Sequence, residues 1–350
     1  MLFPENMRIA QIAPITERVP PKKYGGTERV VYALTEELVR RGHEVTLFAS
    51  GDSITSAKLS SVYPRSLREA RLKDLYGANV FTLLNIGLAY ARADEFDIIH
   101  DHNGHLGVPT ANLSKAPALL TMHGPFTPEA RRLFSELRNP FIATISHAQR
   151  IYAPGLHYAG NVYNGLAMRH YPFSAEHDGY LLFIGRIAME KGVHLAIEAA
   201  QDLALPLIIA AKLDAVDRPY FHEYVEPFLS DEIRWIGEVD EEERNRLMSR
   251  AMCFLHPVTW QEPFGLTLIE AMACGCPVVA FKRGSIPEII RNKRTGFVVR
   301  NIDEMVDAVR RIGSIDRKRC RRYALTNFSA EKMAEGYEAL YQKIINKEIS

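Results

Sequence analysis

Two glutamates, Glu262 and Glu270, flank a glycine-containing turn in the second half of the chain. The turn follows an apolar run that we interpret as a strand, and Pro263 suits the first position of a helix. Free N–H groups at a helix start form an anion site suited to phosphate, and Gly265 lets a ligand approach the backbone closely. Carboxylates also match vicinal sugar hydroxyls, because they accept two hydrogen bonds. We therefore expect both glutamates to face one cleft; two ordinary solvated acids are the alternative.

Arg186 and Lys191 belong to a second motif, Gly185-Arg186-Ile187-Ala188-Met189-Glu190-Lys191-Gly192. It follows another apolar run, so a strand, a glycine turn and a helix start come in succession. Arg can hold two phosphate oxygens at once, whereas Lys supplies a mobile point charge. The pair suits a diphosphate leaving group, whose charge grows in the transition state of a transfer reaction. Surface charges around a tight turn are the alternative.

A glycine pair, Gly25 and Gly26, lies between the first predicted strand and the first predicted helix. The surrounding sequence, Tyr24-Gly25-Gly26-Thr27-Glu28, lacks the Gly-x-Gly-x-x-Gly pattern of dinucleotide-binding proteins. This difference disfavours a nicotinamide-dependent dehydrogenase. The loop is a candidate phosphate contact, and a flexible loop before a helix capped by Thr27 is the alternative.

The run EPFGLTLIEAMACGCPVVA, from Glu262 onward, resembles the E-x7-E signature of glycosyltransferase family 4, which has the GT-B fold. The segment around Arg186 and Lys191 resembles the family's G-R-x4-K-G pattern, and the resemblance covers nearly the whole chain. It implies that Glu270 holds the ribose of a nucleotide and that Glu262 contacts the transferred sugar. It also implies that three backbone amides touch the sugar or its phosphates, those of Phe264, Gly265 and Leu266.

The same resemblance places His123, in Thr121-Met122-His123-Gly124, at the transferred sugar, where its carbonyl or ring would polarise the reacting centre. It places the glycine pair near the donor phosphates. Further matches would read the nucleotide base or line the cleft: Gly237, Glu238 and Val239 for the base, and Ser146 and Asn164 for the cleft. Many relatives have Pro-Ser before the glutamate motif, whereas this chain has the segment HPVTWQ at 256–261. The local contacts of Glu262 are therefore left open.

A histidine-rich segment, His100-Asp101-His102-Asn103-Gly104-His105, contains residue types that bind metals. Successive side chains on a strand point to opposite faces, so we expect no metal site here. Asp101 and His102 are instead candidate contacts for the acceptor. The chain also has no Asp-x-Asp magnesium clamp. We predict a metal-independent reaction in which Arg186 and Lys191 supply the positive charge, with no cofactor besides the donor co-substrate.

Short apolar runs alternate with longer helical patterns along the 350 residues, which predicts parallel sheets built from βαβ units. The fold class is α/β: two Rossmann-like, doubly wound domains that face each other across a cleft, with ligands at the carboxyl ends of the strands. We predict an acceptor domain at 1–165, a linker at 166–178, a donor domain at 179–328, and a C-terminal helix at 329–350 that packs back on the first domain. The predicted strands are 7–14, 44–49, 96–101, 118–122, 141–145, 180–184, 206–210, 233–236, 253–256, 277–280 and 296–299.

The formal net charge of +1 gives no indication of nucleic acid or an anionic membrane as partner. The basic amphipathic segment Arg65–Tyr76 would suit a membrane surface, but a solvated helix is the favoured interpretation. The four cysteines have no zinc-site spacing. No secretory signal or apolar run of spanning length is recognised, so we expect a cytoplasmic protein with free thiols.

The resemblance implies a retaining enzyme that moves a hexose to an acceptor hydroxyl by front-face substitution, with the α configuration kept. UDP-glucose is the first expectation for the donor and GDP-mannose the second. The segment from Pro20 to Ser53 resembles a subgroup that includes glucosyltransferases acting on reduced pterins. The expected partners are a nucleotide sugar and a small-molecule or glycan acceptor. The alternatives are a hydrolytic protein or a catalytically inactive sugar-nucleotide-binding protein of the same fold.

Overall fold

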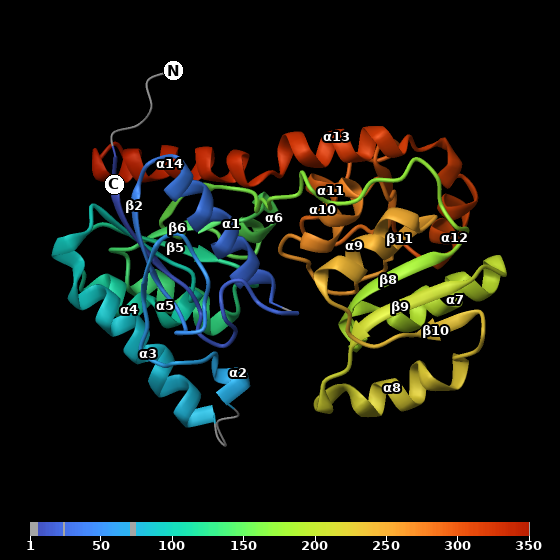
Figure 1. The fold of residues 1–350 in the computed structure, drawn as a ribbon, viewed down its shortest axis with the longest axis horizontal. Helices are drawn as coiled ribbons and strands as arrows, with labels where there is room; N and C mark the ends of the chain where they lie inside the picture. Colours follow the sequence, from blue (N-terminus) through green and yellow to red (C-terminus); the bar gives the residue numbers. More distant parts are fainter. Residues whose placement is uncertain (1–5, 24, 71–74, 350) are drawn as a thin grey trace. The chain divides into compact units, whose positions relative to one another are not determined.

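The computed structural model describes residues 6–23, 25–70 and 75–349, and the chain divides into two compact units (Figure 1). Unit 1 contains residues 1–167 together with 329–350, and unit 2 contains residues 168–328. Each unit is built around its own parallel sheet. The α/β class and the two Rossmann-like sheets expected from the sequence are confirmed.

The sheet of unit 1 has seven strands in the order β3-β2-β1-β4-β5-β6-β7, and every neighbouring pair is parallel. The strands are β1 (Arg8–Ile12), β2 (Glu44–Phe48), β3 (Lys58–Ser60), β4 (Ile98–Asp101), β5 (Ala118–Met122), β6 (Phe141–Thr144) and β7 (Tyr158–Asn161). The helices are α1 (Gly26–Arg40), α2 (Leu67–Ala70), α3 (Leu75–Ala91), α4 (Val108–Asn112), α5 (Pro128–Glu136), α6 (His147–Ile151) and α14 (Ala330–Ile345). Helix α1 packs beside α14, while α3 packs beside α4 (Figure 1).

Alternation along the strands divides the interior of unit 1 into two layers. Ala10, Ile12 and Leu120 belong to an apolar cluster with side chains of α3, α4 and α5. Gln11, on the opposite side of β1, donates a hydrogen bond to Tyr341 of α14. One side of this sheet therefore has an apolar core, and the side that carries Gln11 has buried polar side chains beside a smaller apolar cluster that includes Val31 and Leu47.

The sheet of unit 2 has six parallel strands in the order β10-β9-β8-β11-β12-β13. The strands are β8 (Leu181–Arg186), β9 (Leu207–Lys212), β10 (Ile233–Trp235), β11 (Cys253–His256), β12 (Val278–Phe281) and β13 (Gly296–Val299). The helices are α7 (Val193–Leu203), α8 (Arg218–Tyr224), α9 (Glu241–Arg250), α10 (Leu266–Ala273), α11 (Ile286–Ile289), α12 (Ile302–Arg310) and α13 (Arg317–Asn327). Strands such as β11 and β12 are buried along their whole length, which explains their continuous apolar sequence.

Strand order reverses once in each sheet, and these are the places where open α/β sheets bind ligands. In unit 1, β1 has β2 on one side and β4 on the other. In unit 2, β8 has β9 on one side and β11 on the other. The loops that follow β1 and β4, and those that follow β8 and β11, are therefore the positions favoured for function.

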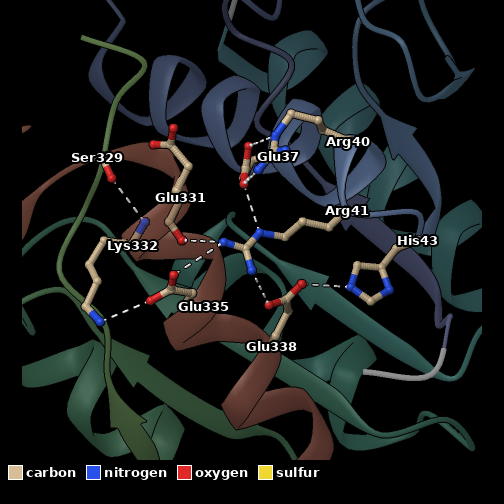
Figure 2. A network of polar contacts seen from close by, with 9 residues as sticks. All are labelled: Glu37, Arg40, Arg41, His43, Ser329, Glu331, Lys332, Glu335 and Glu338. Carbon is tan, nitrogen blue, oxygen red and sulfur yellow. Dashed lines mark hydrogen bonds and ion pairs between the residues drawn. The ribbon is translucent and has the colours of Figure 1, made fainter. Parts of the chain in front are cut away.

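A network of charged side chains attaches α14 to the end of α1 (Figure 2). Arg41 contacts Glu37 through Nε at 2.8 Å and Glu338 through Nη1 at 2.9 Å. His43 accepts a hydrogen bond from the Met7 amide at Nδ1 and contacts Glu338 through Nε2 at 2.9 Å. A side chain on Gly165 would collide with the carbonyl of Ser329, so the backbone at Gly165 packs closely against the residue that precedes α14.

Two local expectations about helix starts are wrong. Thr27 does not cap α1, because the helix begins at Gly26 and its N-cap is Gly25, whose φ of 159° suits glycine. Pro263 is not the first residue of α10, because Gly265 adopts a left-handed φ of 85° and the helix begins at Leu266. In both places a glycine, and not the capping or proline signal, determines where the helix begins.

Strands β3 and β7 were not predicted; both are short and only half-buried for most of their length, so they lack the apolar runs of the central strands. All four cysteines are buried free thiols. Of the basic segment Arg65–Tyr76, residues 71–74 lie outside the described residues. Within the described parts of the chain, no helix has the length and apolar character needed to cross a membrane.

Candidate functional site

In unit 2, the loop after β8 and the loop after β11 are packed directly against each other. The amide of Thr259 donates to the carbonyl of Glu190 at 2.9 Å. Gly192 adopts a left-handed φ of 73°, and a side chain there would collide with the carbonyl of Pro257. The two motifs identified from the sequence therefore form one structure at the point where strand order reverses.

Glu262 is the buried anion of this structure, with its side chain only 9% exposed. Its Oε2 lies 3.1 Å from Lys191 Nζ and accepts a hydrogen bond from Trp260 Nε1 at 3.0 Å. His256 Nε2 lies 3.7 Å away. Burial alone would raise the pKa of Glu262, but the neighbouring His256 and Lys191 outweigh it and lower the pKa to about 2. The carboxylate is therefore ionised at neutral pH.

Lys191 is held between a charge and an aromatic ring. Its Nζ lies 4.5 Å from the ring centroid of Trp260, a cation–π distance. The same Nζ forms the ion pair with Glu262 Oε2. The side chain is 20% exposed, so one side remains open to a ligand. This arrangement positions a cation in the loop after β8 before any donor is bound.

The backbone around Glu262 is supported by the loop after β12. The amide of Ser285 donates to the carbonyl of Glu262 at 2.9 Å, and Ser285 Oγ donates to the carbonyl of Phe264 at 2.9 Å. A side chain on Gly284 would collide with the backbone of Glu262. The orientation of the Glu262 loop is thus fixed by contacts that do not involve its carboxylate.

Arg186, the second cation, is engaged by two acids. Its guanidinium contacts Glu190 through Nη2 and lies 3.4 Å from Asp217 through Nε. Asp217 is a mostly buried side chain whose pKa is raised chiefly by burial. An anionic ligand would therefore have to compete with carboxylates for Arg186.

Glu270 does not share the surroundings expected for it. Its side chain is 1% exposed, and Oε1 lies 2.8 Å from Arg244 Nη2 on α9. Expectation placed Glu270 beside Glu262 on one open cleft, but the structure buries Glu270 against α9 in a separate ion pair. Its position on the second turn of α10, a helix that buries most of its residues, explains the difference.

The start of α10 offers backbone donors more than side chains. Phe264 is buried and its ring packs edge-on against Phe328, with centroids 5.9 Å apart. A side chain on Gly265 would approach Leu268 to 2.7 Å, so the left-handed turn requires glycine. Leu266 is half-buried. The first amides of a helix have no intrahelical acceptor, which leaves them available to an anion.

The loop after β10 contains Gly237, Glu238 and Val239, all half-buried. Gly237 has a φ of 79°, and the space where a side chain would project is open. The loop therefore presents backbone groups at the carboxyl end of a strand in the same sheet.

In unit 1, His123 directly follows β5 and is hydrogen-bonded to His102, which follows β4. His123 Nε2 lies 2.9 Å from His102 Nδ1, and His102 Nε2 lies 2.7 Å from Gln11 Oε1. Burial lowers the pKa of His123 to about 4 and that of His102 well below its usual range. Both rings are consequently neutral at pH 7.

The expectation that the histidine-rich segment points to opposite faces is wrong for His100 and His102. They are two residues apart and share one side of the chain, with ring centroids 4.0 Å apart. Their nitrogens are engaged by hydrogen bonds to Gln11, His123, Thr121 and Tyr341. Over the described residues, no three His, Cys, Asp or Glu side chains are grouped to hold a metal ion.

Asp101 is enclosed by contacts within the turn after β4. It is fully buried and accepts hydrogen bonds from the amide and the Nδ2 of Asn103, both at 2.8 Å. A side chain on Gly107 would collide with its carboxylate. Burial raises the pKa of Asp101 to about 6. These contacts shape the turn after β4 and leave the carboxylate without exposed surface.

The remaining predicted residues of unit 1 lie at strand ends or in loops. Ser146 and Asn164 are buried, and Ser146 Oγ and Asn164 Oδ1 find no hydrogen-bond partner within the described residues. Gly25 is confined, because a side chain there would meet Pro21 at 2.8 Å. Gly26 begins α1, the helix after the first strand.

Sequence reasoning did not identify four residues of these clusters. Trp260 and His256 stand in the segment noted only as a departure from the family pattern, and an aromatic ring two residues before Glu262 was a usable signal. Arg244 lies within a charged helix, where nothing in the sequence distinguishes it from its solvated neighbours. Gln11 stands within an apolar strand and was not singled out. A buried side-chain amide needs hydrogen-bond partners, and this was the available signal.

A transferase for nucleotide sugars is the class that this fold and site define: two Rossmann-like units, with paired cations and a carboxylate beside a helix start. Family comparison agrees, since the family described as "Glycosyl transferases group 1" matches residues 169–326 and "Glycosyltransferase Family 4" matches residues 24–161. The chain belongs to glycosyltransferase family 4, with the GT-B fold. It is a retaining glycosyltransferase that takes its sugar from a nucleotide-sugar donor.

Individual relatives are distant. Spore coat protein SA of Bacillus subtilis is 24% identical, over 96% of this chain and 100% of that protein. Phosphatidyl-myo-inositol mannosyltransferase of Mycobacterium tuberculosis is 26% identical, over 84% of this chain and 82% of that protein. The structure of HepE from Anabaena, in complex with UDP and glucose, superimposes with a TM-score of 0.72 at 18% identity, over 97% and 100% of the two chains.

Proposed function

We propose that this glycosyltransferase moves glucose from UDP-glucose to an acceptor hydroxyl and keeps the α configuration. The observation that carries the proposal is the Lys191–Glu262 pair at 3.1 Å, placed where strand order reverses in unit 2. A donor with a diphosphate and a sugar needs a cation and a hydrogen-bond acceptor side by side. GDP-mannose is the second donor proposed, and a mannosyltransferase among the relatives favours its inclusion.

Arg186 and Lys191 neutralise the diphosphate in this proposal. Their attraction strengthens as the bond to the sugar breaks, because negative charge then collects on the leaving phosphate. The free amides at the start of α10 add further stabilisation. These groups do the work of a metal, so turnover survives EDTA; an absolute requirement for Mg²⁺ or Mn²⁺ contradicts this part of the proposal.

Glu262 serves as an ionised hydrogen-bond acceptor for the hydroxyls of the transferred sugar. Its low pKa suits that role and excludes a general acid that donates a proton at neutral pH. We propose that Glu270 contacts the ribose only after its ion pair with Arg244 rearranges, and that Gly237, Glu238 and Val239 contact the base. His123 acts at the transferred sugar, and Gly25 and Gly26 near the phosphates.

The chemical step proposed is a front-face substitution. The acceptor oxygen forms its bond to the anomeric carbon on the face from which the phosphate departs, and the hydroxyl proton passes to the departing phosphate oxygen. No side chain receives the proton and no covalent sugar–enzyme intermediate forms. The buried free thiols fit a reducing compartment, which supports a cytoplasmic location.

A donor screen tests the proposal. UDP-glucose, GDP-mannose and related nucleotide sugars are each incubated with a pooled acceptor library that includes reduced pterins, and release of UDP or GDP is measured. Acceptor-dependent UDP release from UDP-glucose is expected. Nucleotide release of the same rate with and without acceptors supports the hydrolytic alternative, and binding without release supports the inactive one.

A further inference from the structure

Six buried side chains are joined by a continuous row of hydrogen bonds on the side of the unit 1 sheet that carries Gln11. They are Gln11, His100, His102, Thr121, Tyr337 and Tyr341, and none is more than 3% exposed. The two tyrosines come from α14 and the others from β1, β4, β5 and the turn after β4. The row ends at His123, which is only half-buried.

The contacts follow one after another along this row. From His123 the bonds run to His102 at 2.9 Å and from His102 to Gln11 at 2.7 Å. Gln11 Nε2 donates to the hydroxyl of Tyr341 at 3.1 Å. The same hydroxyl lies 2.6 Å from His100 Nδ1, and His100 Nε2 lies 2.7 Å from Thr121 Oγ1. Thr121 in turn lies 3.1 Å from the hydroxyl of Tyr337.

The orientation of the Gln11 amide gives this row a direction. Gln11 Nε2 faces Tyr341, so its Oε1 faces His102 and must accept a hydrogen bond from His102 Nε2–H. A neutral imidazole has one N–H, so His102 Nδ1 is bare and accepts from His123 Nε2–H. His123 in turn keeps Nδ1 bare. The remaining bonds fit the same direction, in which Tyr341 donates to His100 Nδ1 and His100 Nε2 donates to Thr121.

We propose that Gln11 is a positioning residue that acts through His102 to hold His123 in the tautomer with a bare Nδ1, and that Tyr341 of α14 fixes Gln11 in turn. The proposal rests on the role of His123 at the transferred sugar. A bare ring nitrogen is a hydrogen-bond acceptor, and the chemical class that it recognises is a hydroxyl group of the bound sugar. In the opposite tautomer the same nitrogen would be a donor.

This arrangement gives the C-terminal helix a task beyond packing. Desolvated imidazoles that share hydrogen bonds have little freedom to change tautomer, because every other bond in the row would have to reverse. Support of this kind around a functional histidine usually determines which ring nitrogen carries the proton. The row extends the influence of α14 from the tyrosines to the end of β5.

Nitrogen NMR of the free protein tests the proposal directly. With 15N-labelled histidine, and His123→Ala to assign the signals, the His123 ring is expected to be protonated at Nε2 and bare at Nδ1 at pH 7. A ring protonated at Nδ1 overturns the proposal; the tautomer is measured on the wild-type protein, and His123→Ala serves only to assign its signals. In Gln11→Leu the same ring is expected to show a mixture of tautomers. Tyr337→Phe is the matched control, because Tyr337 stands at the far end of the row and its hydroxyl contacts Thr121, not Gln11 or His102.

Kinetics provide the second readout. Gln11→Leu is expected to lower kcat by about 10- to 100-fold, the range known for removing the hydrogen-bond partner of a metal-bound histidine, with little change in the KM for the donor. Gln11→Glu, which keeps an acceptor opposite His102 Nε2, is expected to recover part of the loss, and Tyr337→Phe to stay close to wild type. Equal losses in Gln11→Leu and Tyr337→Phe, without recovery in Gln11→Glu, indicate a purely structural role and overturn the proposal.

The two hypotheses can fail separately. Full activity of His123→Ala would remove His123 from the proposed reaction, whatever its tautomer. A His123 ring protonated at Nδ1 in an active enzyme would refute the positioning role of Gln11 and leave the transferase activity untouched.

Discussion

Lys191 Nζ lies 3.1 Å from Glu262 Oε2, although the two residues come from different loops. The pairing keeps the cation in place and offsets the cost of burying the carboxylate. A bound diphosphate would share Lys191 with Glu262, so the cation is already oriented when the donor arrives. Such preorganisation is the usual source of electrostatic catalysis.

Loss of Lys191 should therefore reduce turnover more than donor binding. We expect Lys191→Met to lower kcat by about 10²-fold or more, because the leaving-group charge that it stabilises grows along the reaction. Lys212→Met is the matched control: Lys212 ends the neighbouring strand β9 and pairs with Asp214 at 2.7 Å. Steady-state kinetics with the preferred donor measure both variants. Equal kcat values for the two would contradict the role of Lys191.

Removal of one partner of the buried Arg244–Glu270 pair should destabilise the protein strongly. We expect Arg244→Met to lower the free energy of unfolding by about 3–5 kcal/mol, because it leaves a buried carboxylate without its ion pair. The double variant with Glu270→Gln should lose less, since no buried charge remains. Urea unfolding followed by circular dichroism measures the difference. Losses that simply add in the double variant would show that the pair is not coupled.

Asp217 should compete with a diphosphate for Arg186. Asp217→Asn removes one of the two carboxylates around the guanidinium, so UDP should bind about two- to fivefold more tightly, the size typical of a partly exposed ion pair. Asp214→Asn, which removes a nearby acid that pairs with Lys212, is the control. Calorimetric titration with UDP decides the matter, and weaker binding by Asp217→Asn would show that Asp217 supports the arginine instead.

The shifted pKa values lead to an expectation for activity against pH. His123 has a pKa of about 4 and Glu262 of about 2, so neither changes charge between pH 5 and 8. Both values are depressed relative to the unfolded chain, so the stability that they contribute is present above about pH 6.5 for the histidine and about pH 4.5 for the glutamate. It is lost as the pH falls toward 4 and 2, respectively.

Measured kcat/KM should therefore show no ionisation of His123 between pH 5 and 8. Among the described residues, Asp101 and Glu28 have pKa values of about 6 and about 7, raised mainly by burial, so both can titrate in this range. An ionisation that arises from them persists in His123→Gln. An acidic limb between pH 5 and 7 that disappears in His123→Gln would contradict the neutral state assigned to this ring.

The sequence was informative where a local pattern of residues is typical of one kind of structure. Apolar runs located the central strands, and the patterns around Arg186 and Glu262 located the two loops after β8 and β11. Contacts that depend on tertiary packing were beyond reach. Nothing in the sequence pairs Arg244 with Glu270, which come from different helices, and nothing aligns Gln11 with residues on other strands and on α14. The start of α10 was misplaced because a left-handed glycine overrode the proline signal.

The anomeric configuration of the product tests the front-face substitution most directly. The fresh product of UDP-glucose turnover is examined by proton NMR before any mutarotation or hydrolysis, and the anomeric coupling constant distinguishes the two configurations. An α-linked glucoside is expected, because the acceptor attacks the face from which the phosphate leaves and no side chain serves as an inverting base. A β-linked product would contradict it, even though the fold and the Lys191–Glu262 pair would stand.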